Sequence, residues 1–210
     1  MVQSCQASVA MAPSCFSGLL DEVVKGLGLT FVGAPAAFDA LPEQDVELQP
    51  IQADELAYLQ YTSGSTRFPR GVMITQRQVM SNLAGIITEG MEMRSTDRCV
   101  SWLPFYHDLG LVGLVLVPLA SQVTVDYLGT REFAMRPKQW LTLMSNNKAT
   151  ISCSPPFGFE LCNRRLREGE AEQFDLSAWR VAGLGAEMIR PQVLNDFADA
   201  IAPSGFDRKA

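Results

Sequence analysis

The chain has 210 residues, a length that corresponds to one large domain or two small ones. Hydrophobic residues account for 47% and charged residues for 19%, which excludes a disordered, collagen-like or repetitive chain. With 23 acidic and 17 basic residues the formal net charge is −6, which argues against an extended surface for nucleic acid.

The five cysteines are scattered, odd in number and without a Cys-x-x-Cys pair, so the sequence indicates neither a zinc site nor a disulfide framework. This usage favours a reducing, cytoplasmic setting, and no metal-binding residue is assigned. The longest apolar run, 109–120, is shorter than the roughly 20 residues that a membrane helix needs. We therefore predict no membrane span and no secretory leader.

The first part of the chain predicts a small α/β unit. Residues 7–12 and 29–32 can form strands, and apolar residues recur at helical spacing over 16–24. Residues 33–50 are rich in Pro, Ala and acidic side chains without a clear period, which is typical of a surface connection. We expect a boundary near residues 34–53, which divides the chain into residues 1–53 and residues 54–210.

Strands and helices alternate from residue 56 onward. The predicted strands cover residues 56–61, 71–74, 99–103, 122–127, 150–153 and 179–182. The predicted helices cover residues 76–89, 109–119, 137–144, 157–167 and 191–201. Thr75 is placed to cap the helix at 76–89. Alternation of apolar strands with helices predicts an α/β fold with a mainly parallel sheet flanked by helices.

Residues 61–71 carry the clearest chemical signal. They read YTSGSTRFPRG and place hydroxyl groups, two glycines and two arginines between two predicted strands. Hydroxyl and backbone N–H groups donate to phosphate oxygens, glycine allows close approach, and arginine offers a planar fork to an anion. The segment is not a Walker A loop, because Val72 stands where lysine should follow the second glycine. Composition alone leaves a flexible turn as an equal alternative to a polyphosphate site.

Four segments in order together resemble the motifs of the fatty acyl-AMP ligase branch of the adenylate-forming enzymes. They are residues 61–71, 102–111 (WLPFYHDLGL), 154–162 (SPPFGFELC) and 175–187 (DLSAWRVAGLGAE). The resemblance spans about residues 54–205. It implies that residues 54–210 form part of the adenylation subdomain in the large domain of such an enzyme. Residues 1–53 would then be the end of a preceding subdomain and a linker.

The resemblance implies a role for each motif. The phosphates of ATP would be bound by Thr62, Ser63, Gly64, Ser65, Thr66, Arg70 and Gly71. The adenine side would be lined by Gly185, Ala186 and Glu187. The acyl substrate would contact His107, Asp108, Ser154, Phe157 and Gly158. No catalytic residue is assigned within the chain.

Four positions depart from the family pattern. Arg67 stands where glycine is usual and Arg70 where lysine is usual, so the charge in the phosphate loop is more spread. Pro156 and Leu184 stand at positions that are commonly asparagine in this branch. Individual contacts at these positions therefore differ from the family pattern, while the backbone of both loops can be retained.

Several of these residues also have a structural interpretation. His107, the only histidine, is not needed as a general base because a carboxylate substrate is already ionised, and it can simply be hydrogen-bonded within the fold. Phe157, Gly158 and residues 109–117 suit an acyl channel but suit core packing better. Glu187 would equally cap the helix that begins near Pro191.

The resemblance implies a whole protein that condenses a fatty acid with ATP, with Mg²⁺ present, to acyl-AMP and pyrophosphate. The acyl group would then pass to the phosphopantetheine thiol of an acyl carrier protein. An acyl-CoA ligase shares the first half-reaction, and a non-catalytic degenerate ligase or carrier-docking module is the alternative from another class. The family's magnesium-binding glutamate and late lysine have no counterpart in residues 1–210, so we expect an internal fragment that is inactive alone.

Overall fold

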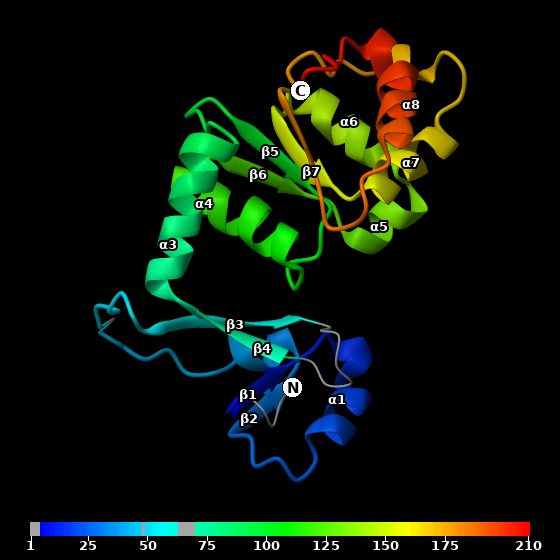
Figure 1. Cartoon of the computed structure of the whole chain (residues 1–210). Helices are drawn as coiled ribbons and strands as arrows, with labels where there is room; N and C mark the ends of the chain where they lie inside the picture. The colour runs from blue at the N-terminus through cyan, green and yellow to red at the C-terminus, as the bar shows by residue number, and fades with distance from the viewer. Residues whose placement is uncertain (1–4, 48, 63–69) are drawn as a thin grey trace. The chain divides into compact units, whose positions relative to one another are not determined.

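The computed structural model describes residues 5–47, 49–62 and 70–210 (Figure 1). The chain divides into two compact units, residues 1–79 and residues 80–210. Helix α3 (Gln76–Gly85) crosses from the first unit to the second.

The first unit contains a parallel strand pair and an antiparallel hairpin. Its elements are β1 (Val9–Met11), η1 (Ser14–Phe16), α1 (Ser17–Val24), β2 (Phe31–Gly33), α2 (Pro35–Asp39), β3 (Leu56–Thr62) and β4 (Arg70–Thr75). Strands β1 and β2 are parallel, whereas β3 and β4 are antiparallel. The prediction of an irregular connection at 33–50 was wrong over α2, where the ring of Phe38 packs edge-on against Phe31 at 4.8 Å.

Helix α3 begins where the sequence predicted. The Gln78 N–H donates to Thr75 Oγ1 at 3.3 Å, and the Thr75 N–H donates to Gln78 Oε1 at 2.9 Å. This reciprocal pair satisfies two N–H groups at the helix start. Thr75 is therefore confirmed as the N-cap.

The second unit alternates strands and helices. After α3 it contains η2 (Ile86–Gly90), β5 (Arg98–Ser101), η3 (Leu109–Leu116), α4 (Val117–Ser121), β6 (Thr124–Tyr127), α5 (Thr130–Met135), α6 (Lys138–Asn146), β7 (Ile151–Ser154), α7 (Pro156–Arg165), η4 (Glu170–Gln173), β8 (Val181–Leu184), α8 (Pro191–Ile201) and η5 (Ala202–Ser204). The four strands are all parallel, in the order β6-β5-β7-β8. Helices cover the sheet on both faces (Figure 1). The predicted fold class, a mainly parallel sheet flanked by helices, is confirmed.

The strand order creates a switch point between β5 and β7. From β5 the chain moves outward to β6, then returns to place β7 on the other side of β5. The loops that follow β5 and β7 therefore leave the sheet in opposite directions. In open parallel sheets, ligands bind in the crevice that such diverging loops leave at the carboxyl ends of the strands.

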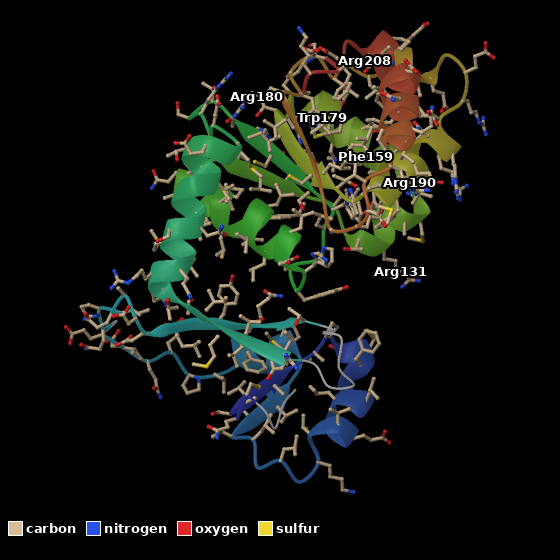
Figure 2. The ribbon with its side chains drawn as sticks, viewed as in Figure 1. Arg131, Phe159, Trp179, Arg180, Arg190 and Arg208 are labelled. Carbon is tan, nitrogen blue, oxygen red and sulfur yellow. The ribbon has the colours of Figure 1, made fainter. Side chains whose placement is uncertain are left out.

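An aromatic cluster fills the space under α6, α7 and α8. Trp140 is fully buried at its centre, and its ring lies 5.3 Å from both Phe159 and Trp179. Phe159 and Trp179 are labelled in Figure 2. The Trp140 indole N–H donates to Ser152 Oγ at 2.9 Å, and Ser152 Oγ donates to the Val100 carbonyl at 2.6 Å. The cluster thereby fixes α6 over β5 and β7 without leaving these polar groups unpaired.

An ion pair ties together the opposite, amino edge of the sheet. Arg180 Nε lies 2.9 Å from Asp97 Oδ1, and the guanidinium also donates to the carbonyl oxygens of Met91 and Glu92. Asp97 accepts a further hydrogen bond from Thr150 Oγ1 at 2.7 Å. Burial alone would raise the pKa of Asp97, but the hydrogen bonds from Arg180, Arg94 and Thr150 hold that pKa below its ordinary value.

The structure differs from the prediction at residues 109–119 and at α5. The predicted buried helix at 109–119 is a π-helix, η3, followed by α4, and Leu119 is 71% exposed. Helix α5 was not predicted, because a six-residue helix shows less than two turns of periodicity. In the part of the chain that the structure describes, no helix combines the length and apolarity needed to cross a bilayer.

Candidate functional site

The ends of the predicted phosphate loop are the paired ends of a hairpin. Thr62 of β3 lies opposite Arg70 of β4, and Tyr61 lies opposite Gly71. A Cβ at Gly71 would lie 3.2 Å from the ring of Tyr61, so glycine allows the ring to cover this strand. Thr62, Arg70 and Gly71 are exposed, as a ligand contact requires. The other predicted phosphate contacts, Ser63, Gly64, Ser65 and Thr66, lie outside the described residues, so the phosphate site stays a prediction.

The switch point of the second unit contains a cavity of about 250 Å³. Its walls come from the loops after β5, β7 and β8 and from the start of α5. The lining residues are Trp102, Leu103, Pro104, His107, Leu109, Thr130, Pro155, Phe157, Ala186 and Glu187. The structure thus brings together predicted acyl contacts, His107 and Phe157, with predicted adenine contacts, Ala186 and Glu187. We call this space the edge cavity.

Glu187 joins two of these loops. Its Oε1 accepts a hydrogen bond from the Phe157 backbone N–H at 2.8 Å. That N–H belongs to the first turn of α7, where the helix itself offers no acceptor and where a negative charge is favourable. Glu187 therefore caps α7, not the helix α8 that its sequence position suggested as an alternative. The preceding residue, Ala186, has a φ of +70°, which is rare for a residue with a Cβ.

The floor of the edge cavity is rigid. Trp102 stacks on Phe133 at 3.8 Å and meets Phe157 edge-on at 5.5 Å. A Cβ at Gly158 would lie 2.1 Å from Ser154 Oγ and 2.7 Å from Trp102, so only glycine fits there. Ser154 is fully buried and donates to the Pro155 carbonyl at 2.8 Å. Ser154 and Gly158 therefore stand behind the cavity wall, and direct substrate contact by them stays a prediction.

Trp102, which lines the edge cavity, has a buried polar atom without a partner in the described part of the chain. The indole N–H of Trp102 is buried and finds no acceptor among the described residues. A buried donor left unpaired costs about 1–3 kcal/mol, so such groups commonly mark a place where a ligand or water binds. Trp102 belongs to the quoted motif at 102–111 but was not predicted as a site residue.

A larger cavity of about 540 Å³ adjoins the edge cavity, and Leu109 and Ala186 line both spaces. Its walls are mostly aliphatic and are formed by Asn82, Ile86, Gly90, Met91, Asp108, Leu109, Val112, Gly113, Val181, Gly183 and Ala186. We call it the aliphatic cavity. Leu109, Val112 and Gly113 belong to the segment 109–117 that the sequence suggested for an acyl channel, and Asp108 and Ala186 were also predicted site residues. Asn82, Ile86, Gly90, Met91, Val181 and Gly183 were missed, because they lie outside the quoted site residues.

His107 and Asp108 meet at the start of η3. Asp108 Oδ1 accepts a hydrogen bond from the Leu109 N–H at 2.7 Å, and His107 Nδ1 lies 3.2 Å from the same nitrogen. His107 faces the edge cavity, whereas Asp108 lines the aliphatic cavity. Both side chains are about half exposed or more. The arrangement holds the start of η3 between the two cavities and leaves Nε2 of His107 available to a ligand.

Gly185, which was predicted, and Thr130, which was not, lie at the margins of this region. Gly185 follows the end of β8 and lines neither cavity, and a Cβ there would meet no atom within 4 Å. Thr130, which was missed, lines the edge cavity and donates through Oγ1 to the Trp102 carbonyl at 2.9 Å. Its position just beyond the carboxyl end of β6 was the available signal. Within the described ranges, no group of three or more His, Cys, Asp or Glu residues is placed to hold a metal ion.

Comparison with known proteins identifies related chains. The profile of the AMP-binding enzyme family matches residues 4–205. A Caulobacter vibrioides protein provisionally named an acyl-CoA synthetase is 42% identical over 210 residues, which cover all of this chain and 36% of the relative. The medium-chain fatty acid acyl-carrier-protein ligase JamA of Moorena producens is 39% identical over 160 residues, 76% of this chain and 27% of the relative.

A solved structure is also closely similar. It comes from a study of fatty acyl-adenylate ligases from E. coli and L. pneumophila, superimposes with a TM-score of 0.92 and is 52% identical. The match covers 98% of this chain and 38% of that structure's chain. The chain therefore spans about a third of the length of the proteins it matches.

Proposed function

The chain belongs to the AMP-binding enzyme family, and on this premise we propose that the whole protein activates a fatty acid with ATP. A carboxylate oxygen attacks the α-phosphorus of ATP. The bond between the α-phosphorus and the oxygen that bridges it to the β-phosphorus breaks, and acyl-AMP and pyrophosphate form. The carboxylate is ionised at neutral pH, so the step needs orientation and charge stabilisation more than a general base.

The observation that carries this proposal is the edge cavity at the switch point. His107, Phe157, Ala186 and Glu187, which come from three separate motifs, line one cavity of about 250 Å³ there. Core packing alone would not require these motifs to meet at the carboxyl edge of the sheet. That edge is where ligands of open parallel sheets bind. We propose that this cavity holds the reacting carboxylate and the adjoining adenosine.

The aliphatic cavity supports a fatty acyl substrate. Its walls include Ile86, Met91, Leu109 and Val112, and its volume of about 540 Å³ lies within the usual range for a ligand pocket. Because Leu109 and Ala186 line both cavities, an acyl chain in the aliphatic cavity would present its carboxylate next to the edge cavity. We propose that His107 and Asp108 border this junction.

We propose that Thr62, Ser63, Gly64, Ser65, Thr66, Arg70 and Gly71 bind the phosphates, with Mg²⁺ as the counter-ion of ATP in the whole protein. The antiparallel pairing of Thr62 with Arg70 supports this, since it holds both ends of the loop together. The arginine would stabilise charge that develops on the departing pyrophosphate.

We further propose that the acyl group passes to the phosphopantetheine thiol of an acyl carrier protein and that the protein is cytoplasmic. The carrier-protein ligase among the relatives supports the acceptor, whereas the acyl-CoA synthetase supports CoA as the second candidate. The scattered cysteines, odd in number and without a Cys-x-x-Cys pair, support a reducing compartment. The isolated chain is proposed to lack adenylating activity by itself.

The test uses the whole protein and measures fatty acid-dependent exchange of pyrophosphate with ATP. Exchange with a medium- or long-chain fatty acid, and none without it, is the expected result. Addition of CoA or of a holo acyl carrier protein, followed by detection of the thioester, then identifies the acceptor. A whole protein that binds ATP but gives no exchange with any fatty acid would instead be a non-catalytic module.

A further inference from the structure

A separate, basic groove shares no lining residue with either cavity. It has a volume of about 540 Å³ and is formed where the end of α5, the start of α6 and the end of α7 meet. Its walls include Met135, Arg136, Lys138, Arg164, Arg165 and Arg167. Residues 131–167 contain seven basic and two acidic residues in a chain whose net charge is −6. We call this surface the basic groove.

Nearby carboxylates neutralise only part of this charge. Lys138 Nζ lies 2.9 Å from Glu170 Oε2, and Arg164 pairs with Glu160. Arg136 and Arg165 form no ion pair within the described ranges, and both are exposed. The groove therefore presents an excess of positive charge to solvent.

The side chains of the groove favour an acidic protein surface over a small anion as its binding partner. Its cations are on long, exposed side chains in water, where a single contact with an anion is weak. Met135, in the same groove, is 61% exposed and adds an apolar contact. Several spread charges around an apolar contact match an acidic protein surface, for which complementary charge raises the association rate.

Two helices connect the basic groove with the edge cavity. Thr130 at the start of α5 and Phe157 in the first turn of α7 line the edge cavity, whereas Met135 and Arg165 at the ends of these helices line the groove. With a rise of 1.5 Å per residue, the two helices span roughly 9 and 15 Å. A flexible prosthetic arm can cover this distance while its carrier stays bound at the groove.

We propose that the basic groove is the docking surface for an acidic acyl carrier protein, which positions its phosphopantetheine arm toward the edge cavity. This inference rests on the proposed function, because the carrier is the proposed acceptor. Docking through exposed charges affects encounter and orientation of the carrier and leaves the adenylation step unchanged.

The test is a charge reversal in the whole protein, R136E together with R165E. We expect the KM for an acidic holo acyl carrier protein to rise at least tenfold, and the wild-type KM to rise with added salt, because both changes weaken charge attraction. Fatty acid-dependent pyrophosphate exchange, which needs no carrier, should stay within twofold of wild type. K209E is the matched control: it reverses one exposed charge outside the groove, and its carrier KM should not change.

The possible failures are distinguishable. Absence of exchange in the wild-type protein would contradict the proposed function, whereas normal exchange with an unchanged carrier KM in the double variant would overturn only the docking proposal. Micromolar binding of inorganic pyrophosphate that R136E and R165E abolish, with the carrier KM unchanged, would make the groove a small-anion site and also overturn it.

Discussion

Glu187 and Phe157, which are 30 residues apart in sequence, are joined by a hydrogen bond of 2.8 Å from the Phe157 N–H to the Glu187 carboxylate. The bond ties the loop after β8 to the first turn of α7, and both segments line the edge cavity. Sequence position had suggested that Glu187 caps the nearer helix α8. A residue that looks like a local cap therefore holds two motifs of the candidate site together.

We expect E187A to destabilise the protein by about 1 kcal/mol, because an N-terminal cap is lost and the Phe157 N–H is left to water. E187Q keeps an oxygen acceptor and should lose less. Urea unfolding of both variants measures the difference. In the whole protein E187A should also raise the KM for ATP, since the loop that carries Ala186 is released. Equal stability of E187A and wild type would show that the bond does not hold the loop.

The close packing around Gly158 predicts that a larger side chain there destabilises the protein. G158A should destabilise by about 2 kcal/mol or more, because the added Cβ must displace Ser154 and the Trp102 ring from close packing. G85A is the matched control: Gly85 has a helical φ of −62° and open space around it, so alanine should be neutral or stabilise by about 0.5 kcal/mol. Thermal unfolding of the two variants checks the contrast, and a G158A variant as stable as G85A would contradict this packing.

The parallel sheet was predictable because its strands are short, apolar and separated by helical periods. Helix α8 begins and ends at the residues that its amphipathic pattern predicts. Helix α2 was missed because Pro35 and two alanines look like a connection, and only the contact of Phe38 with Phe31 reveals a packed helix. The local sequence pattern predicts a helix whose apolar face repeats over several turns. It does not predict a short helix that is stabilised by a single tertiary contact.

The site was predictable only as a set of motifs. The sequence identified His107, Phe157, Ala186 and Glu187, but their grouping around one cavity depends on the strand order β6-β5-β7-β8. Thr130 was missed because α5 is short, and Asn82, Ile86 and Met91 were missed because they lie outside the motifs, although residues 109–117 were suggested for an acyl channel. Long-range pairing of strands supplies this information, and no local spacing contains it.

Removal of Asp97 from its ion pair with Arg180 should cause a large loss of stability. D97A should destabilise the protein by about 3 kcal/mol, because the Asp97 side chain is 1% exposed and its removal leaves the Arg180 guanidinium without a charge partner. The exposed pair of Arg77 and Asp54 is the matched control, and D54A should cost less than about 1 kcal/mol. Denaturant unfolding distinguishes them. Similar losses in the two variants would show that burial does not strengthen the Asp97 pair.

The same pair predicts an acid-dependent loss of stability. The hydrogen bonds from Arg180 and Thr150 hold the pKa of Asp97 below its ordinary value despite burial, so the unfolded chain binds the proton more readily. This contribution is complete above the ordinary aspartate pKa of about 4 and is lost as pH falls toward the lower folded pKa.

The free energy of unfolding of the wild type should therefore fall below about pH 4, and that of D97N should fall less steeply. E168Q, which removes an exposed carboxylate elsewhere, should keep the wild-type slope. Urea unfolding between pH 2 and 7 provides the measurement, with all three proteins at one ionic strength. A D97N profile parallel to that of wild type would assign the acid sensitivity to other carboxylates.

Arg70, at the end of the hairpin opposite Thr62, tests the phosphate site. In the whole protein R70A should reduce the rate of ATP–pyrophosphate exchange by about a hundredfold, because one preorganised donor to developing charge commonly contributes 10²–10³. R70K restores the residue usual at this position and should recover most of the rate. R77A, which removes an exposed arginine after β4, controls for loss of charge nearby. Exchange by R70A within twofold of wild type would remove Arg70 from the phosphate site, whatever the loop around it binds.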